Sequence, residues 1–593
     1  MVRGVIRDRA APVQRWVVHA PQTLRALVRA DEIWLVILAA FIGIGAGLLV
    51  VAINNTTLFA HRMLFALDND GRLSGLSALD PQRAVMVPAI GGLLLGAAGL
   101  AIGHFYPGRP VDPIEANALH GGRMSLRDSL IVVGQTLISN GAGASIGLEA
   151  GYTQIGSAFA SRLGRAFRVR RADLRVLVGC GAAGAIGAAF DAPLAGAFYA
   201  FELVIGTYSL ANLAPVTLAS ICAIIVTHAL NGAAPSLALA MPAAIDWRDY
   251  VPILLLGVIC AVVGIAIMRM VTLTESLFRR SRVPLWCRPA IGGLIVGCLA
   301  LVTPAVLSSG HSALRLGLNG SYGLEQAGLL LLLKALASSI SIGSGFRGGL
   351  FFASLFLGVL TGTVAGDLLS MVTTNSLPPV TCALISMSAL AVAVVGGPLT
   401  MVFLALESTG SLPLTVAVLV ASVVSALTVR RTFGYSFATW RFHLRGESIR
   451  SALDIGWIRN LTVGRMMRRE QRTLRSDTSI ASVRRDYPLG SAQRVVVVDE
   501  AGRYLGIVQV PDLHADGHEV SRLGELLTDD GAALLPQMNV KEAIAMFERA
   551  ESDALVVIDD PERRQVIGLL TEQHALRRYS EELDRSRREL SGE

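Results

Sequence analysis

Long apolar stretches separated by short polar segments run through the chain as far as residue 446. The first apolar stretch covers 33–58 and the second covers 84–104. Each is long enough for a membrane-spanning helix, which needs about 20 apolar residues. The basic, amphipathic segment before them, 1–32, is expected to form a cytoplasmic helix at the membrane surface.

Between residues 130 and 427 the apolar pieces are shorter, and glycine, proline and serine interrupt them. Interrupted helices are tolerated in a membrane only where protein or a cavity surrounds them. A helix is expected to begin near Pro113, because proline in a first turn gives up only an unpaired N–H group. The pattern predicts an all-α, multi-pass membrane domain over 33–446.

Two segments of this domain resemble each other. Residues 190–202 read FDAPLAGAFYAFE and residues 395–407 read VGGPLTMVFLALE, and each ends in a glutamate. A glycine-rich block precedes each copy, at 141–156 and at 341–362. Matching interrupted segments in two halves are typical of a transporter whose site lies between the halves. For Glu202 and Glu407 a structural role is favoured over proton carriage, because both halves keep the residue.

The block at 141–156 reads GAGASIGLEAGYTQIG and holds one acidic residue, Glu149. Glycine allows close backbone approach, and a carboxylate at membrane depth is costly enough to suggest a functional site. Helix N-termini offer backbone N–H groups to anions. We therefore predict an anion gate in which Glu149 competes with the anion. The alternative is a buried glutamate held by hydrogen bonds in the helix packing.

Composition and charge agree with a membrane protein. Hydrophobic residues make up 52% of the chain and charged residues 16%, against about 25% charged in soluble proteins. Arginines crowd beside the apolar stretches, at 3–29, 162–175, 279–288 and 430–450. The positive-inside rule then predicts a cell (inner) membrane protein with its N-terminus and C-terminal tail in the cytoplasm. These flanking positions argue against nucleic-acid binding.

Other chemistry is not favoured by the sequence. The six cysteines show no CxxC or CxH spacing, so we predict neither a metal site nor a disulfide framework. His104, His120 and His311 are isolated near the ends of apolar stretches, so no enzyme is predicted. A cation carrier remains as an alternative, but hard cations need clustered oxygen ligands and the spans hold few acids.

After residue 460 the composition becomes that of a soluble α+β module that occurs twice. Each copy has two Val- and Ile-rich strands joined by a short polar turn, and a helix is expected over 540–550. The predicted parts are a linker, two modules and a charged tail, at 447–460, 461–514, 523–579 and 580–593.

Together these motifs resemble the CLC family of chloride channels and proton-coupled anion antiporters, with a tail similar to a tandem pair of CBS domains. The run GLEAG at 147–151 is similar to the family's G-[KR]-E-G-P block, and GGLF at 348–351 to its G-x-F-x-P block. The resemblance implies two inverted halves, a homodimer embedded in membrane lipid, and a small inorganic anion, chloride by default. It also implies that Glu149 is the gate, with backbone N–H groups coordinating the anion. The residues around that anion would be Gly147, Leu148, Ala150, Leu350, Phe351 and Phe352.

The chain departs from the family at both pore hydroxyls. The serine position holds Gly108 or Arg109, beside Pro110. Arg109 either offers its guanidinium to a polyatomic anion or is a surface arginine. The tyrosine position falls on Ala438, with Tyr435 nearby. Nitrate and bicarbonate therefore stay open beside chloride.

Two further departures concern protons and nucleotides. Leu203 stands where proton-coupled members carry a second glutamate, which favours a channel or uncoupled transport, with proton-coupled antiport as the alternative. Each CBS-like module keeps half of the nucleotide pattern, Asp512 in the first and Thr571 in the second. The pair is expected either to bind an adenosine nucleotide or only to stabilise the dimer, and no other cofactor is predicted.

Overall fold

The computed structural model describes residues 32–67, 72–105, 110–232, 245–372, 377–434, 436, 440, 461–469, 473–490, 494–514, 522–527 and 531–591. The predicted pore positions Gly108, Arg109, Tyr435 and Ala438 lie outside these ranges, as do most of the segment 1–32 and the linker 447–460. The chain divides into two compact units, Met1–Asp454 and Ile455–Glu593.

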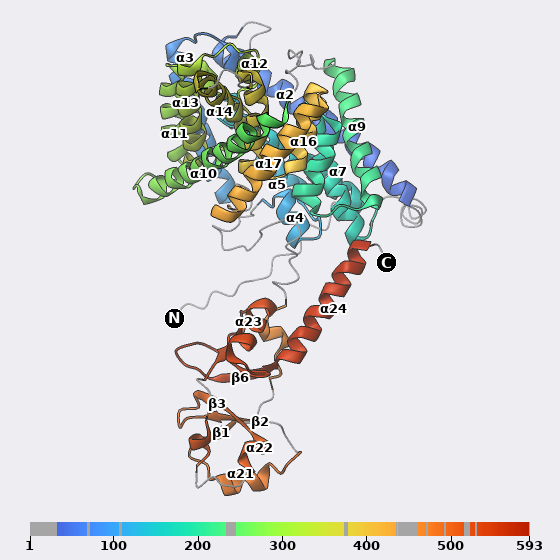
Figure 1. Ribbon diagram of the computed structural model, residues 1–593, viewed down its shortest axis with the longest axis vertical. Helices are drawn as coiled ribbons and strands as arrows, with labels where there is room; N and C mark the ends of the chain where they lie inside the picture. The colour runs from blue at the N-terminus through green and yellow to red at the C-terminus, as the bar shows by residue number, and fades with distance from the viewer. Residues whose placement is uncertain are drawn as a thin grey trace. The chain divides into compact units, whose positions relative to one another are not determined.

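The first unit is built of helices (Figure 1). Its first half holds α2 (Glu32–Phe65), α3 (Pro81–Phe105), α4 (Pro113–Leu119), α5 (Leu126–Gly141), α6 (Glu149–Ala166), α7 (Arg171–Phe190), α8 (Pro193–Tyr199) and α9 (Leu210–Asn231). Its second half holds α10 (Tyr250–Arg280), α11 (Arg288–Ala300), α12 (His311–Leu318), α13 (Leu324–Ser344), α14 (Phe351–Val372), α15 (Pro379–Val395), α16 (Pro398–Thr409) and α17 (Leu412–Thr432). Among the described residues, 8 helices are long and apolar enough to cross a membrane.

Several helices are too short to cross a membrane, which confirms the prediction of interrupted helices. Among them are α4, α8 and α12, with 7, 7 and 8 residues. Helix α4 begins at Pro113, as expected, and the Asp112 side chain caps it by accepting a hydrogen bond from the Ile114 N–H group. A π-helical turn, η3 (Ala200–Ile205), follows α8 directly and carries Glu202.

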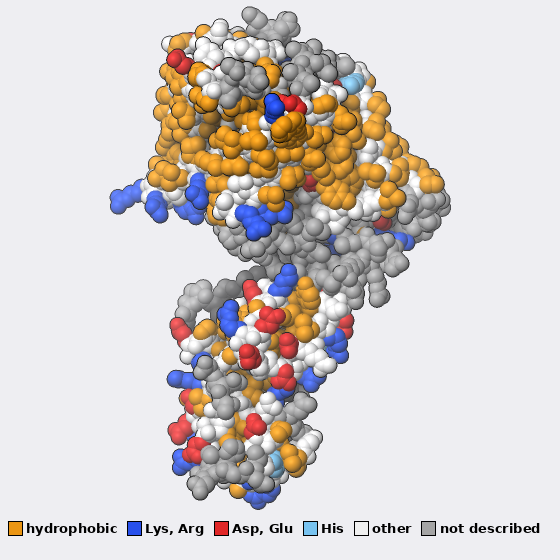
Figure 2. All heavy atoms as spheres, in the orientation of Figure 1, with side chains coloured by type: hydrophobic (Ala, Val, Ile, Leu, Met, Phe, Trp, Pro, Cys, Tyr) orange, Lys and Arg blue, Asp and Glu red, His pale blue; other side chains and the backbone are white. Residues whose placement is uncertain are grey.

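A broad belt of apolar side chains crosses the face of the helical unit that Figure 2 shows. Large side chains such as Phe41, Leu210 and Leu412 are more than half exposed, which suits contact with lipid rather than water. Inside, helices approach closely where glycines face each other. A Cβ atom on Gly156 would lie 2.5 Å from the Gly181 carbonyl oxygen, so α6 and α7 pack backbone to backbone.

A fully buried lysine, Lys334 on α13, holds the loop that leads into α12. Its Nζ atom donates hydrogen bonds to the carbonyl oxygens of Val306, at 3.0 Å, and Ser308, at 2.8 Å. We expect Lys334→Met to lower the melting temperature of the purified protein, because each buried carbonyl left unpaired costs about 1–3 kcal/mol. Arg279→Met, on an exposed side chain of α10, is the control. Equal melting temperatures for the two variants would contradict this role of Lys334.

The second unit repeats one motif. Its strands are β1 (Thr473–Arg475), β2 (Arg494–Val498), β3 (Tyr504–Gln509), β4 (Ala533–Leu534), β5 (Ala554–Ile558) and β6 (Val566–Thr571). They form two sheets, β1-β2-β3 and β4-β5-β6, each with one parallel and one antiparallel pair. The irregularity in register falls at the same place in both copies, after Val497 and after Val557. The predicted duplicated α+β module is confirmed.

The helices of this unit are α20 (Val463–Met466), α21 (Ile480–Asp486), α22 (Val510–Leu513), α23 (Val540–Ala550) and α24 (Glu572–Ser591). The helix expected over 540–550 is confirmed as α23. The charged segment 580–593 does not begin a new element, because α24 starts at Glu572 and runs to Ser591.

Candidate functional site

The two glycine-rich blocks meet at the centre of the helical unit. Helix α6 begins at Glu149 and α14 begins at Phe351. The loops before them pair as a short antiparallel bridge: the Gly147 N–H group donates to the Gly349 carbonyl at 2.9 Å, and Gly349 donates back to Gly147 at 3.1 Å. The N-terminal ends of two long helices, one from each half, therefore start side by side.

The Glu149 carboxylate lies on the start of the opposite helix. The side chain is buried, and Oε1 accepts a hydrogen bond from the Phe352 backbone N–H group at 3.2 Å. Within the described residues, Oε2 has no hydrogen-bond partner. Backbone N–H groups at a helix start attract negative charge. The Glu149 carboxylate thus takes up a backbone donor at the start of α14.

Gly147 leaves room for this carboxylate. A Cβ atom at Gly147 would lie 1.9 Å from Oε2 of Glu149. We expect Gly147→Ala to displace the carboxylate from the Phe352 N–H group, and so to raise anion flux into liposomes at neutral pH. Gly99→Ala on α3, where a Cβ atom meets nothing within 4 Å, is the control. A flux below that of wild type would show that the methyl group closes the site instead.

Polar side chains hold the Gly147 loop in place. Asn140 Nδ2 donates to the Ile146 carbonyl at 2.6 Å, and its Oδ1 accepts from the Ser308 hydroxyl at 3.1 Å. The Ser145 N–H group donates to Ser341 Oγ at 3.0 Å. The loop is therefore tied to its own half by Asn140 and to the other half by Ser308 and Ser341.

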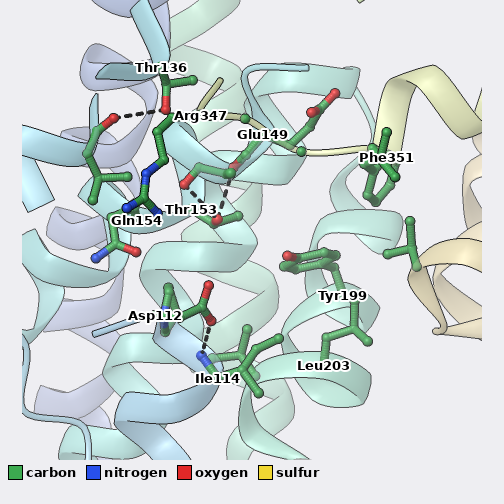
Figure 3. A pocket seen from close by; sticks show the side chains of 18 of the residues that line it. Asp112, Ile114, Thr136, Glu149, Thr153, Gln154, Tyr199, Leu203, Arg347 and Phe351 are labelled. Atoms are coloured by element: carbon green, nitrogen blue, oxygen red, sulfur yellow. Dashed lines mark hydrogen bonds between the residues drawn. The ribbon is translucent and has the colours of Figure 1, made fainter. Parts of the chain in front are cut away.

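Glu149 lines two cavities. The Asp112 cavity, of about 520 Å³, is lined by Pro110, Asp112, Thr136, Glu149, Ala150, Thr153, Gln154, Tyr199, Leu203, Arg347, Leu350 and Phe351 among others (Figure 3). The Arg72 cavity, of about 400 Å³, is lined by Arg72, Leu148, Glu149, Tyr152, Asp191, His228, His311, Arg315 and Phe352 among others. Glu149 is therefore shared by the walls of both cavities.

Most of the predicted site residues that the structure describes come together here. Ala150, Leu350 and Phe351 line the Asp112 cavity, and Leu148 and Phe352 line the Arg72 cavity. Gly147 forms the bridge between the halves. Pro110 and Leu203 line the Asp112 cavity from the side of α4 and η3.

Several polar residues of the Asp112 cavity were not predicted from the sequence, among them Tyr199 and Arg347. The Tyr199 ring extends into the cavity between Glu149 and Leu203 (Figure 3). A signal was present, because Tyr199 precedes Leu203 by four residues and so shares its helix face. Arg347 directly precedes the Gly348–Gly349 pair, and its N–H group donates to Ser139 Oγ at 3.1 Å. In the sequence, a basic residue directly before a glycine-rich block was the signal that could have identified Arg347 as a site residue.

The two repeat glutamates cap helices of the opposite half. Glu407 on α16 accepts hydrogen bonds from the N–H groups of Leu194, at 2.7 Å, and Ala195, at 2.9 Å, at the start of α8. Glu202 on η3 accepts from Leu399 at 2.9 Å and Thr400 at 2.8 Å, at the start of α16. The favoured structural role of these glutamates agrees with this reciprocal arrangement.

In the second unit the predicted nucleotide residues lie at equivalent ends of the two modules. Asp512 belongs to α22, directly after β3. Thr571 ends β6, and its hydroxyl accepts a hydrogen bond from the His574 N–H group at 3.4 Å, near the start of α24. Nucleotide binding by this pair stays a prediction.

Comparison with known proteins places the chain in a family. The family model for voltage gated chloride channels matches residues 108–430, and that for CBS domains matches residues 523–581. A ClcB-like chloride channel protein of Ralstonia nicotianae is 30% identical over 404 residues, which cover 67% of this chain and 93% of that protein. The voltage-gated ClC-type chloride channel ClcB of Salmonella typhimurium is also 30% identical, over 66% of this chain and 95% of that protein.

Solved structures share the fold. A slow cyanobacterial Cl⁻/H⁺ antiporter matches with a TM-score of 0.61 and 20% identity, over 69% of this chain and 97% of that one. A eukaryotic CLC transporter matches with a TM-score of 0.60 and 17% identity, over 93% of this chain and 98% of that one. The chain therefore belongs to the voltage-gated chloride channel (CLC) family and carries a CBS domain in its C-terminal unit.

Proposed function

We propose that the protein carries a small inorganic anion, chloride by default, along a path that Glu149 gates. The observation that supports this proposal is the position of the Glu149 carboxylate between two cavities, on the Phe352 N–H group. When the carboxylate is protonated or swings away, an anion takes its place at the start of α14. Backbone N–H groups hold an anion weakly enough for it to leave again.

Leu203 favours a channel or uncoupled transport. Its side chain lines the Asp112 cavity and packs against Ile114 and Ala118. A leucine neither binds nor releases a proton, so the cavity lacks a titratable group at this position. In this proposal the anion moves down its gradient without obligatory proton exchange.

Proton-coupled antiport is a second candidate, and specific residues favour it. Asp112, Tyr199 and Thr153 all line the cavity that leads to Glu149, and the Thr153 hydroxyl donates to the Glu149 carbonyl at 2.9 Å. Water held among these groups would offer a proton route that bypasses Leu203. The cyanobacterial structure with the same fold is of a Cl⁻/H⁺ antiporter.

We propose a homodimer in the cell (inner) membrane, with the arginine-rich side and the CBS pair in the cytoplasm. Arg279 and Arg280 end α10, and Arg430 and Arg431 lie in the last turn of α17, as the positive-inside rule requires. The Asp112 cavity then opens toward the cytoplasm. Arg347 places a guanidinium in it, which keeps nitrate and bicarbonate open as transported anions.

Flux from liposomes tests both candidates. Purified protein is reconstituted with chloride inside, and chloride efflux and external pH are recorded together. We expect chloride efflux without movement of protons against their gradient. Uphill proton movement would establish the antiport candidate. Potassium flux without chloride flux would overturn the proposal in favour of a cation carrier.

A further inference from the structure

Two arginines meet in the Arg72 cavity, on the other side of Glu149 from Leu203. Arg72 directly precedes the short helix η2 (Leu73–Gly75), and Arg315 lies on α12. These elements are joined because the Ser312 N–H group donates to Ser74 Oγ at 3.3 Å. Both arginine side chains line the cavity, and their charges are close enough to repel each other.

Neither arginine has an acidic partner within the described part of the chain. The acidic residues that line the same cavity are Asp191 and Glu149. Asp191 is paired with His228, with 2.6 Å between Oδ1 and Nε2. Glu149 is directed at the Phe352 N–H group. Two like charges in a partly enclosed cavity raise the local potential and favour an anion there.

A histidine ring lies in the same cavity as the two arginines. His311 lines the cavity, and its ring stacks on that of Phe352 with 3.6 Å between centroids. Phe352 in turn supplies the N–H group that binds Glu149. The arginine cavity and Glu149 are therefore linked through His311 and Phe352.

We propose that Arg72 and Arg315 form a second anion-binding site in the Arg72 cavity. The planar guanidinium fork matches planar oxyanions, so nitrate is expected to bind this site more tightly than chloride. The site would concentrate anions beside Glu149, and in that role it rests on the proposed function. Binding itself does not depend on transport.

Binding and flux together test the site. Nitrate and chloride are titrated calorimetrically into the full-length protein in detergent, and nitrate uptake by liposomes is measured against external concentration. For the double change Arg72→Gln/Arg315→Gln we expect nitrate affinity to fall, and the KM for external nitrate to rise, by about tenfold or more, as on losing a charge-assisted contact. Arg72→Lys, which keeps the charge but removes the planar fork, is expected to weaken nitrate binding more than chloride binding. Arg83→Gln, an arginine paired with Asp80, is the control.

The outcomes separate this site from the gate. Nitrate affinity unchanged in the double variant would overturn the site, even if Glu149→Gln alters flux. Absence of anion flux in wild type would overturn the proposed function, while the calorimetry would still decide the site. If the double variant unfolds, Arg315→Gln alone is titrated, and a loss of nitrate binding at an unchanged melting temperature supports the proposal.

Discussion

Chloride flux through the Glu149→Gln variant is expected to be the same at acidic and neutral pH, whereas wild-type flux rises as the pH falls. In the proposed function the ionised carboxylate, which accepts the Phe352 N–H group, competes with chloride for that donor. Acid protonates the carboxylate, which weakens that hydrogen bond and lets the anion in. Glutamine has the same shape but no charge at any pH, so the competition is permanently weak.

The size of the effect follows from the same hydrogen bond. A hydrogen bond to a charged group contributes about 1.5–3 kcal/mol, so at neutral pH we expect the variant to exceed wild-type flux by about tenfold or more. The measurement is chloride efflux from liposomes over a series of pH values. Glu275→Gln, on an exposed side chain of α10, is the control. Flux through Glu149→Gln that still rises in acid would exclude Glu149 as the gate.

The local pattern of the sequence was enough to predict the elements that carry Glu149 and the loop opposite it. Glycine density and one acidic residue singled out the block at 141–156, and the repeated order of blocks indicated a partner at 341–362. Helix α4 starts at the predicted Pro113 because proline in a first turn gives up only an unpaired N–H group, which is a property of that turn alone. Helix α23 likewise follows from its own apolar spacing and its Asn539 cap.

Contacts between distant segments could not be predicted in this way. The pairing of Gly147 with Gly349 depends on how the two halves pack, and spacing along the chain does not encode that. The meeting of Arg72 with Arg315 depends on the same packing. Arg72 follows a polar segment and Arg315 lies on a short helix, so neither residue stands in a sequence pattern that predicts a binding site. Tyr199 was not predicted although its spacing from Leu203 was a signal, because an aromatic residue in an apolar helix resembles an ordinary core residue.

Replacing Glu202 or Glu407 by glutamine is expected to destabilise the protein while leaving the acid dependence of flux intact. Each carboxylate accepts two backbone N–H groups at the start of a helix from the other half. Glutamine keeps one oxygen acceptor and places an NH₂ donor against the second N–H group. The loss is about 2 kcal/mol or more, because charge-assisted bonds to a helix start are replaced by a weaker bond and a repulsion.

The two substitutions are expected to destabilise the protein to different extents. Glu202 also accepts the Thr400 hydroxyl at 2.6 Å, so Glu202→Gln should lower the melting temperature in detergent more than Glu407→Gln does. Glu325→Gln, at an exposed position in the first turn of α13, is the control. A proton-carrying Glu202 would behave differently, because its loss would abolish proton movement at an unchanged melting temperature. Because each glutamate caps a short helix of the other half, we expect instead a lower melting temperature with the acid dependence of flux intact.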